Sequence, residues 1–283
     1  GISSAASDVY KRQSLFFAVV YLHMFRGLLY GSYQKPKELV WIFGCTIYLA
    51  MMAEGFLGYV LPYGQMSYWG AQVIISLFGA IPYIGESLEL WVRGDYYISG
   101  ITVSRFFALH VVALPLVLIA LVFLHLVALH EVGAGNPEGV DIEKYLDDDG
   151  VPLDSVPFFP YKVLNALVAI GVFMTVFAVI MFFFPEGGGY FIEMANFQEA
   201  NPLVTPDHIA PVWYYAPFYT MLRAIPDPLG GLIVMAAGVA IFFVVPWLDR
   251  SKVASIRYKG IYSKIALTSV SYTHLTLPTI FRV

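Results

Sequence analysis

The segment SRFFALHVVALPLVLIALVFLHLVALHEVG, residues 104–133, decides the fold, because it is one long apolar run with His110 and His125 inside it. A helix rises ~1.5 Å per residue, which places the two imidazoles roughly 22 Å apart. That distance is most of the ~30 Å hydrocarbon core of a bilayer. Ionisable side chains at such depths are costly and usually functional, and neutral imidazole is a good axial ligand for haem iron. Two histidines at two depths therefore indicate two haems stacked across a membrane.

The composition also points to a membrane. Of the 283 residues, 59% are hydrophobic and 13% are charged, whereas soluble chains average about 45–50% and about 25%. The net charge of −4 gives no indication of nucleic-acid binding. The single cysteine, Cys45, excludes an intrachain disulfide and a Cys-x-x-Cys-His haem attachment. Any haem here is therefore held without covalent links, and Cys45 is expected to pack as a small apolar residue.

Five apolar runs have about 20 residues or slightly more, the length that a membrane helix needs. They are residues 14–33, 39–61, 106–129, 163–184 and 229–248. A sixth stretch, residues 68–91, is broken by Gly79, Pro82 and Gly85, and we interpret it as interfacial helices. The expected fold is an all-α transmembrane bundle with five spans and interfacial helices.

Basic residues near the span ends predict the orientation. Lys35 and Lys37 lie between the first two spans, and Arg250, Lys252 and Arg257 follow the fifth. These loops and the acidic 136–161 loop are then cytoplasmic, and the 59–105 and 185–228 connections share the opposite side.

Both ends of the chain differ in character from the rest. Residues 1–13 are small and polar, with a basic pair against an apolar helix, and residues 268–283 have neither helical nor strand periodicity. We interpret both as non-native sequence, similar to translated cloning sequence. Residues 14–160 are then expected to form a haem-binding region with three spans, and residues 161–267 a second region with two spans and a long loop.

Two glycines on the second span support the haem interpretation. Gly44 and Gly58 are 14 residues apart, so they lie near one helical face at two depths. Glycine lets a flat ring approach the backbone closely. Helix–helix packing is the alternative, since glycine is common in membrane helices. Because His110 and His125 also lie at two depths, we favour the interpretation that the glycines accommodate haems.

A third histidine, His23, lies at the cytoplasmic depth of His125. His110 lies at the opposite end and needs a partner about 14 residues before His23, where the chain has Val9. The spacing of 15 between His110 and His125 leaves an offset of about 60°, which a kink at Pro115 is expected to absorb. The alternative for each histidine is a hydrogen-bonded polar group in a bundle.

Several stretches resemble cytochrome b of the proton-translocating quinol:cytochrome c oxidoreductases, the cytochrome bc complexes. The resemblance covers essentially all of residues 14–267 and looks bacterial, with both halves in one chain. The stretches are LHMFRGLLYGSY (22–33), GYVLPYGQMSYWGA (58–71), SRFFALH (104–110), HLVALHEVG (125–133), NPEGV (136–140), HIAPVWYYAPFYTMLRAIP (208–226) and PWLDRSKVASIRYKG (246–260).

The resemblance implies two non-covalent b-type haems. His23 and His125 would hold the high-potential haem near the cytoplasm, and His110 would be one ligand of the low-potential haem near the periplasm. Arg26 would neutralise a haem propionate. The family's first helix would precede residue 14 and its last helices would follow residue 267, so we expect a fragment that is inactive alone.

The resemblance also implies two sites for a quinone, expected to be ubiquinone. Quinol would be oxidised at the periplasmic site, where one electron would go to a Rieske iron–sulfur protein and the other to the haems. Quinone is reduced at the cytoplasmic site. Interfacial anchoring is the alternative for each periplasmic tyrosine. The expected periplasmic residues are Tyr59, Gly70, Ala71, residues 81–85, Pro211, Trp213, Tyr214 and Tyr219.

One departure from the family concerns proton transfer. The family usually has Pro-Glu-Trp-Tyr, where this chain has Val212 in place of the glutamate thought to accept a quinol proton. Valine cannot accept it, so another group or water must. Residues of the same loop that could do so are Glu193, Glu199, Asp207 and His208.

At the cytoplasmic site, His130 resembles the family's quinone-contacting histidine, and a surface histidine is the alternative. The aspartate that the family usually has at the start of the next span is missing from PFFPYKVLN (157–165), where Lys162 or Asn165 would substitute.

We therefore expect the dihaem subunit of a quinol:cytochrome c oxidoreductase, multi-pass in a bacterial inner membrane. Its partners would be a Rieske protein, a cytochrome c1-type subunit, quinone, lipid and a second copy of the complex. One rival is a dihaem membrane anchor of another quinone-linked oxidoreductase, which should lack the PVWY and GYVLPYGQMSYWGA segments. The other is a non-redox transporter or structural bundle.

Overall fold

The structure, a computed structural model, describes residues 2–184, 193–265 and 267–269. These residues form an all-helical fold without β-strands. The α-helices are α1 (Ile2–Leu29), α2 (Glu38–Val60), α3 (Gln65–Gly79), α4 (Gly85–Arg93), α5 (Gly100–Ala108), α6 (Leu114–Val132), α7 (Val163–Phe183), α8 (Ala216–Arg223) and α9 (Pro228–Leu248).

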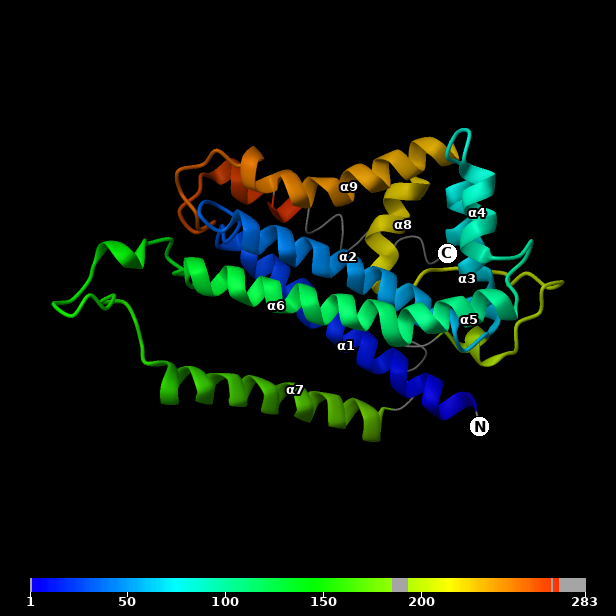
Figure 1. The fold of residues 1–283 in the computed structure, drawn as a ribbon, viewed down its shortest axis with the longest axis horizontal. Coiled ribbons are helices and arrows are strands. Elements are labelled where there is room, and N and C mark those ends of the chain that lie inside the picture. Colours follow the sequence, from blue (N-terminus) through cyan, green and yellow to red (C-terminus); the bar gives the residue numbers. More distant parts are fainter. Residues whose placement is uncertain (1, 185–192, 266, 270–283) are drawn as a thin grey trace.

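The long helices run side by side, with α2 between α6 and α9 (Figure 1). The short helices α3, α4, α5 and α8 gather at one end of this bundle, and α7 lies at its margin and contacts α1. Helix α7 has no buried residue. An apolar helix with this exposure requires lipid or another protein around it.

Four helices of the described residues are long and apolar enough to cross a membrane, which indicates a multi-pass membrane protein. They are Glu38–Val60, Gly100–Val132, Phe158–Phe183 and Pro228–Leu248. The first expected run, residues 14–33, lies in α1, which ends at Leu29, and its apolar part, Gln13–Leu29, is shorter than the other four helices. Gly31 has a φ of +63° directly after this helix, and such a turn stops it before Tyr33.

The sixth apolar stretch forms two helices, α3 and α4, as expected. The chain turns between them at Tyr83, which has a φ of 68°. Buried Arg93 ends α4 and pairs with Glu89, and its guanidinium also donates to the main-chain oxygen of Tyr96. The pairing with Glu89 compensates the positive charge of Arg93, which is buried among the short helices.

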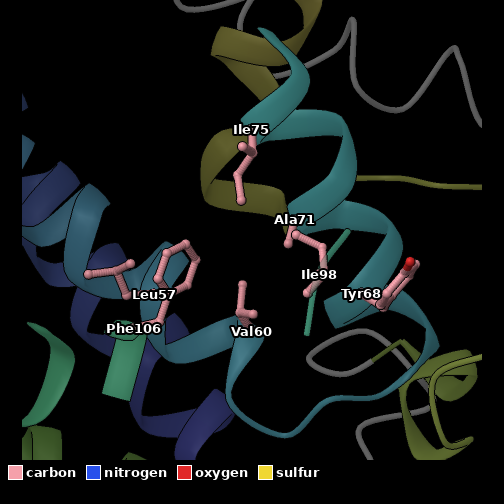
Figure 2. Packing of buried hydrophobic residues seen from close by; sticks show 7 residues of the cluster. All are labelled: Leu57, Val60, Tyr68, Ala71, Ile75, Ile98 and Phe106. Atoms are coloured by element: carbon pink, nitrogen blue, oxygen red, sulfur yellow. The ribbon is translucent and has the colours of Figure 1, made fainter. Parts of the chain in front are cut away.

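An apolar cluster packs the short helices α3 and α5 against α2 (Figure 2). Leu57 and Val60 at the end of α2 pack with residues of α3 and with Phe106 of α5. Ile98, fully buried, fills the cluster from the connection before α5. The cluster holds the end of α2 and the start of the His110 segment together.

Residues Leu109–Ala113, which join α5 to α6, form a π-helix, η1. Its wider turn is closed by the main-chain N–H of Leu114, which donates to the carbonyl oxygen of Leu109 five residues earlier. Pro115 follows η1 closely inside one continuous helix, Gly100–Val132, where its ring and missing N–H interrupt the α-helical bonding. The one-residue excess between His110 and His125 is thus taken up by η1, next to Pro115.

A charged cluster at the other end of the bundle joins α1, α9 and the chain after α9. Asp249 accepts hydrogen bonds from Tyr33 at 2.6 Å, Gln34 at 3.0 Å and Lys259 at 2.6 Å. Burial alone would raise the pKa of Asp249, but the bonds from Lys259, Tyr33, the Ser251 N–H and Gln34 outweigh it and lower the pKa to about 2. Asp249 therefore stays ionised as the anchor of this end.

Candidate functional site

His23 of α1 and His125 of α6 lie opposite one another, as their matched depths predict. The two ring centroids are 6.4 Å apart, and the ring planes are inclined by 73°. Nδ1 of His125 is buried, and the ring interacts with the main chain of Val40. The two imidazoles face each other, with His23 exposed and His125 half-buried.

His110 and His125 each lie over a glycine of α2. A β-carbon on Gly44 would lie 3.4 Å from Cε1 of His125, and one on Gly58 would lie 2.5 Å from Cε1 of His110. The glycines are 14 residues apart and the histidines 15, and η1 absorbs the difference. The two antiparallel segments thereby present two matched glycine–histidine pairs at two depths.

His110 also contacts Glu54 of α2. Its Nδ1 lies 3.0 Å from the main-chain oxygen of Glu54 and 3.0 Å from Oε1 of the same residue. The side chains are 25% and 21% exposed, respectively. The residue expected opposite His110 is at position 9, whose side chain lies outside the described residues.

The residues at the His23–His125 depth fit a bis-imidazole haem. Two metal–nitrogen bonds of about 2 Å each, with the two ring radii, require a centroid separation of about 6 Å, close to that observed. The described residues contain no group of three or more His, Cys, Asp or Glu side chains arranged to hold a metal ion. Gly44 leaves room beside His125 for a flat ring.

Two further residues expected at the cytoplasmic end are exposed. His130 lies in the last turn of α6, and Arg26 lies in the last turn of α1 with its guanidinium 5.7 Å from the ring centre of Tyr30. Lys162 and Asn165, at the start of α7, are exposed as well. The structure leaves these side chains accessible to a ligand from this end.

The 211–219 stretch is held against α1 and α2 by aromatic side chains. Tyr214 is 2% exposed and stacks on Phe17 with ring centroids 4.0 Å apart. Tyr21 donates to the main-chain oxygen of Tyr214 at 2.7 Å, and Tyr215 donates to that of Met52 at 2.6 Å. Tyr214 thus packs inside the protein, whereas the sequence led us to expect that its ring could flank a quinone.

The remaining expected residues of this site differ in exposure and contacts. Trp213 is 37% exposed, and Tyr219 of α8 accepts a hydrogen bond from Arg223 at 3.2 Å. Tyr59 lies near the end of α2, and its main-chain oxygen accepts from Ser67 Oγ at 2.5 Å. Pro211 is half-buried at the start of the stretch. Among Tyr59, Trp213 and Tyr219, Trp213 has the most exposed side chain, and Tyr83 of the expected 81–85 stretch is fully exposed.

Hydrogen bonds fix the loop that precedes Pro211 to the start of α3. Asn196 is buried, accepts from the Ser67 N–H at 2.8 Å and donates to Ser67 Oγ at 3.0 Å. Gln65 donates to the main-chain oxygen of Val204 at 2.9 Å and accepts from the Asn201 N–H at 2.7 Å. These bonds position the loop across the end of α2 that carries Tyr59.

Val212 packs against an apolar cluster whose buried members are Phe17, Tyr48, Met51, Tyr214 and Phe218. The valine therefore has a packing role at the position where the family usually has glutamate. Of the candidate replacement groups, Glu199, Asp207 and His208 are exposed and Glu193 is half-buried.

Sequence reasoning missed Glu54 and the tyrosine pair of Tyr21 and Tyr48, whose hydroxyls lie 2.8 Å apart. Glu54 had a signal: it is the one charged residue among positions 39–60, and intramembrane carboxylates are functional candidates by default. The tyrosine pair had none, because 17% of the chain is aromatic and a contact between α1 and α2 is not visible in one sequence.

Comparisons with known proteins agree with this arrangement. Residues 14–217 match a family model described as cytochrome b (N-terminal)/b6/petB, and residues 199–280 match one described as cytochrome b (C-terminal)/b6/petD. A solved structure titled hyperthermophilic respiratory complex III is similar with a TM-score of 0.86 and 34% identity, over 95% of this chain and 69% of that chain.

Curated relatives share the same description. Cytochrome b of Allochromatium vinosum is 56% identical over 87% of this chain and 61% of its own length. Cytochrome b of Rickettsia bellii is 50% identical over 88% of this chain and 60% of its own length. Cytochrome b/c1 of Bradyrhizobium diazoefficiens is 46% identical over 87% of this chain and 34% of its own length. The chain thus spans about three fifths of the length of the cytochrome b relatives, and by sequence and fold it belongs to the cytochrome b family.

Proposed function

We propose that this chain carries electrons across a bacterial inner membrane through two b-type haems, as part of a quinol:cytochrome c oxidoreductase that translocates protons. The observation that carries the proposal is the facing pair of His23 and His125, with ring centroids 6.4 Å apart. The similarity to a respiratory complex III structure supports the same function.

Haem supplies a reversible one-electron couple when it is bound. His23 and His125 would supply both axial nitrogens at the cytoplasmic depth, and His110 would supply one at the other depth. Gly44 and Gly58 leave space beside these imidazoles. Arg26, exposed at the end of α1, would pair with a propionate at the cytoplasmic depth.

The quinol site would lie where the 211–219 stretch and α8 meet the end of α2. Trp213 and Tyr59 would flank the ring, Pro211 would shape the entrance, and Tyr219 would bind a quinone oxygen through its hydroxyl. Tyr214 would hold the stretch in place by its stack on Phe17. At the cytoplasmic end, exposed His130 would contact the quinone that is reduced there, with ubiquinone as the expected species.

The expected partners are a Rieske iron–sulfur protein and a cytochrome c1-type subunit in a dimeric complex. The relative named cytochrome b/c1 supports an association with a c1-type protein. The rivals, another quinone-linked dihaem anchor and a non-redox bundle, remain as outcomes of the test.

The test is a reduced-minus-oxidised spectrum and a haem assay of the intact complex, with His23→Leu and His125→Leu variants. In a complex that carries the native residues before Ser14, we expect two b-type haems, of which one is lost in either variant. Absence of a b-type band contradicts electron transfer. Haem without quinol:cytochrome c activity favours the rival membrane anchor.

A further inference from the structure

Glu54 stands out within α2 because the other residues from 39 to 60 are uncharged. A carboxylate inside a membrane span is costly and needs a partner. Oε2 of Glu54 is buried and has no hydrogen-bond partner in the described part of the chain. Oε1 lies 3.0 Å from Nδ1 of His110. His110 is therefore the group toward which the Glu54 side chain is directed.

The geometry fixes the tautomer of His110. The main-chain oxygen of Glu54 also lies 3.0 Å from Nδ1, and a carbonyl oxygen can only accept a hydrogen bond. Nδ1 therefore carries a proton and donates it, so in the neutral imidazole Nε2 has the lone pair that a metal ion requires.

We propose that Glu54 is the positioning residue of His110, which holds Nε2 free for iron and strengthens it as a ligand. This inference rests on the proposed function, in which His110 is a haem ligand. A second-shell acceptor on the far nitrogen orients a ligating imidazole and raises its basicity. A more basic axial ligand favours oxidised iron and lowers the midpoint potential of the haem.

The two depths differ in this respect. His125 interacts with the main chain of Val40, whereas Nδ1 of His110 has both a main-chain oxygen and a carboxylate oxygen of Glu54 at 3.0 Å. The effect of Glu54 should therefore be confined to the haem at His110. An electron would then move favourably from the His110 depth to the His125 depth, away from the quinol site.

The experiment is a redox titration of both haems in the intact complex with Glu54→Gln and Glu54→Leu. Gln preserves the shape and an acceptor, so Glu54→Gln tests the role if Glu54→Leu fails to assemble. Thr46→Val is the matched control, since Thr46 lies on the same helix and bonds only its own turn, to the main-chain oxygen of Ile42. Haem content and low-temperature spectra are measured in parallel.

We expect the midpoint potential of the His110 haem to rise in Glu54→Gln and further in Glu54→Leu, with a haem affinity about 10-fold to 100-fold lower at that site in Glu54→Leu. The other haem and Thr46→Val should be unchanged. Two haems with unaltered potentials in both Glu54 variants overturn the role of Glu54 and leave the proposed function intact. A single haem in the unmutated complex overturns the assignment of His110 itself.

Discussion

Gly58 lies so close to His110 that a β-carbon on the glycine would come within 2.5 Å of Cε1 and 3.0 Å of Nε2 of the imidazole. The corresponding distance from Gly44 to His125 is 3.4 Å, an ordinary contact. The same residue type therefore has unequal importance at the two depths.

Gly58→Ala should displace the His110 ring, because an extra carbon in a packed contact costs about 1–3 kcal/mol unless a neighbour moves. Gly44→Ala should be tolerated. The measurement is haem content and thermal stability of the intact complex for both variants. Equal losses in the two variants would mean that the glycines act through helix packing alone.

The π-helix η1 predicts how the chain responds to changes in length. Deletion of Val112 should convert η1 to α-helix and keep His110 over Gly58, because the spacing to His125 then equals the 14 residues between the glycines. Insertion of one alanine at the same point should turn His110 away by about 100°. We expect the deletion to retain both haems and the insertion to lose the one at His110. Identical spectra for the two variants would contradict the role given to η1.

Val212→Glu should not rescue a missing activity. Val212 is half-buried and packs against an apolar cluster, so a carboxylate there would lose part of its hydration without gaining a partner, which costs stability. We expect the intact complex to oxidise quinol with Val212, and Val212→Glu to lower stability. Steady-state turnover across pH, with single neutralisations of Glu193, Glu199, Asp207 and His208, is the measurement. An increase of orders of magnitude in Val212→Glu contradicts this view.

The Asp249 cluster predicts a stability that depends on pH. The folded pKa of about 2 lies below the ordinary value of 3.8, so the folded state binds fewer protons, and the stabilisation is present above about pH 4 and declines as the pH falls toward 2. Solvent screening limits it to on the order of 1 kcal/mol. Asp249→Asn should flatten the dependence in detergent unfolding between about pH 6 and about pH 3. If Asp249→Asn loses stability at low pH as much as the unmutated protein does, other carboxylates cause that loss.

The sequence predicted the helices well because apolar run length is a strong signal in membrane chains. It also paired His23 with His125, since depth along a helix can be counted. The end of α1 at Leu29 was missed, because Tyr33 is apolar and a left-handed turn at Gly31 leaves little trace in hydropathy. The burial of Tyr214 was missed because it depends on Phe17, nearly 200 positions away in the chain.

The wide turn at Leu109–Ala113 also affects how related chains are compared. A chain with one residue fewer between the two histidines is expected to lack this bulge and to keep the flanking turns in register. The gap in such an alignment belongs within residues 109–113. If the gap is placed nearer His125, every residue between the bulge and the gap is aligned with the wrong residue of the other chain. The residues around the histidines would then be taken as different between the chains when only their alignment is shifted.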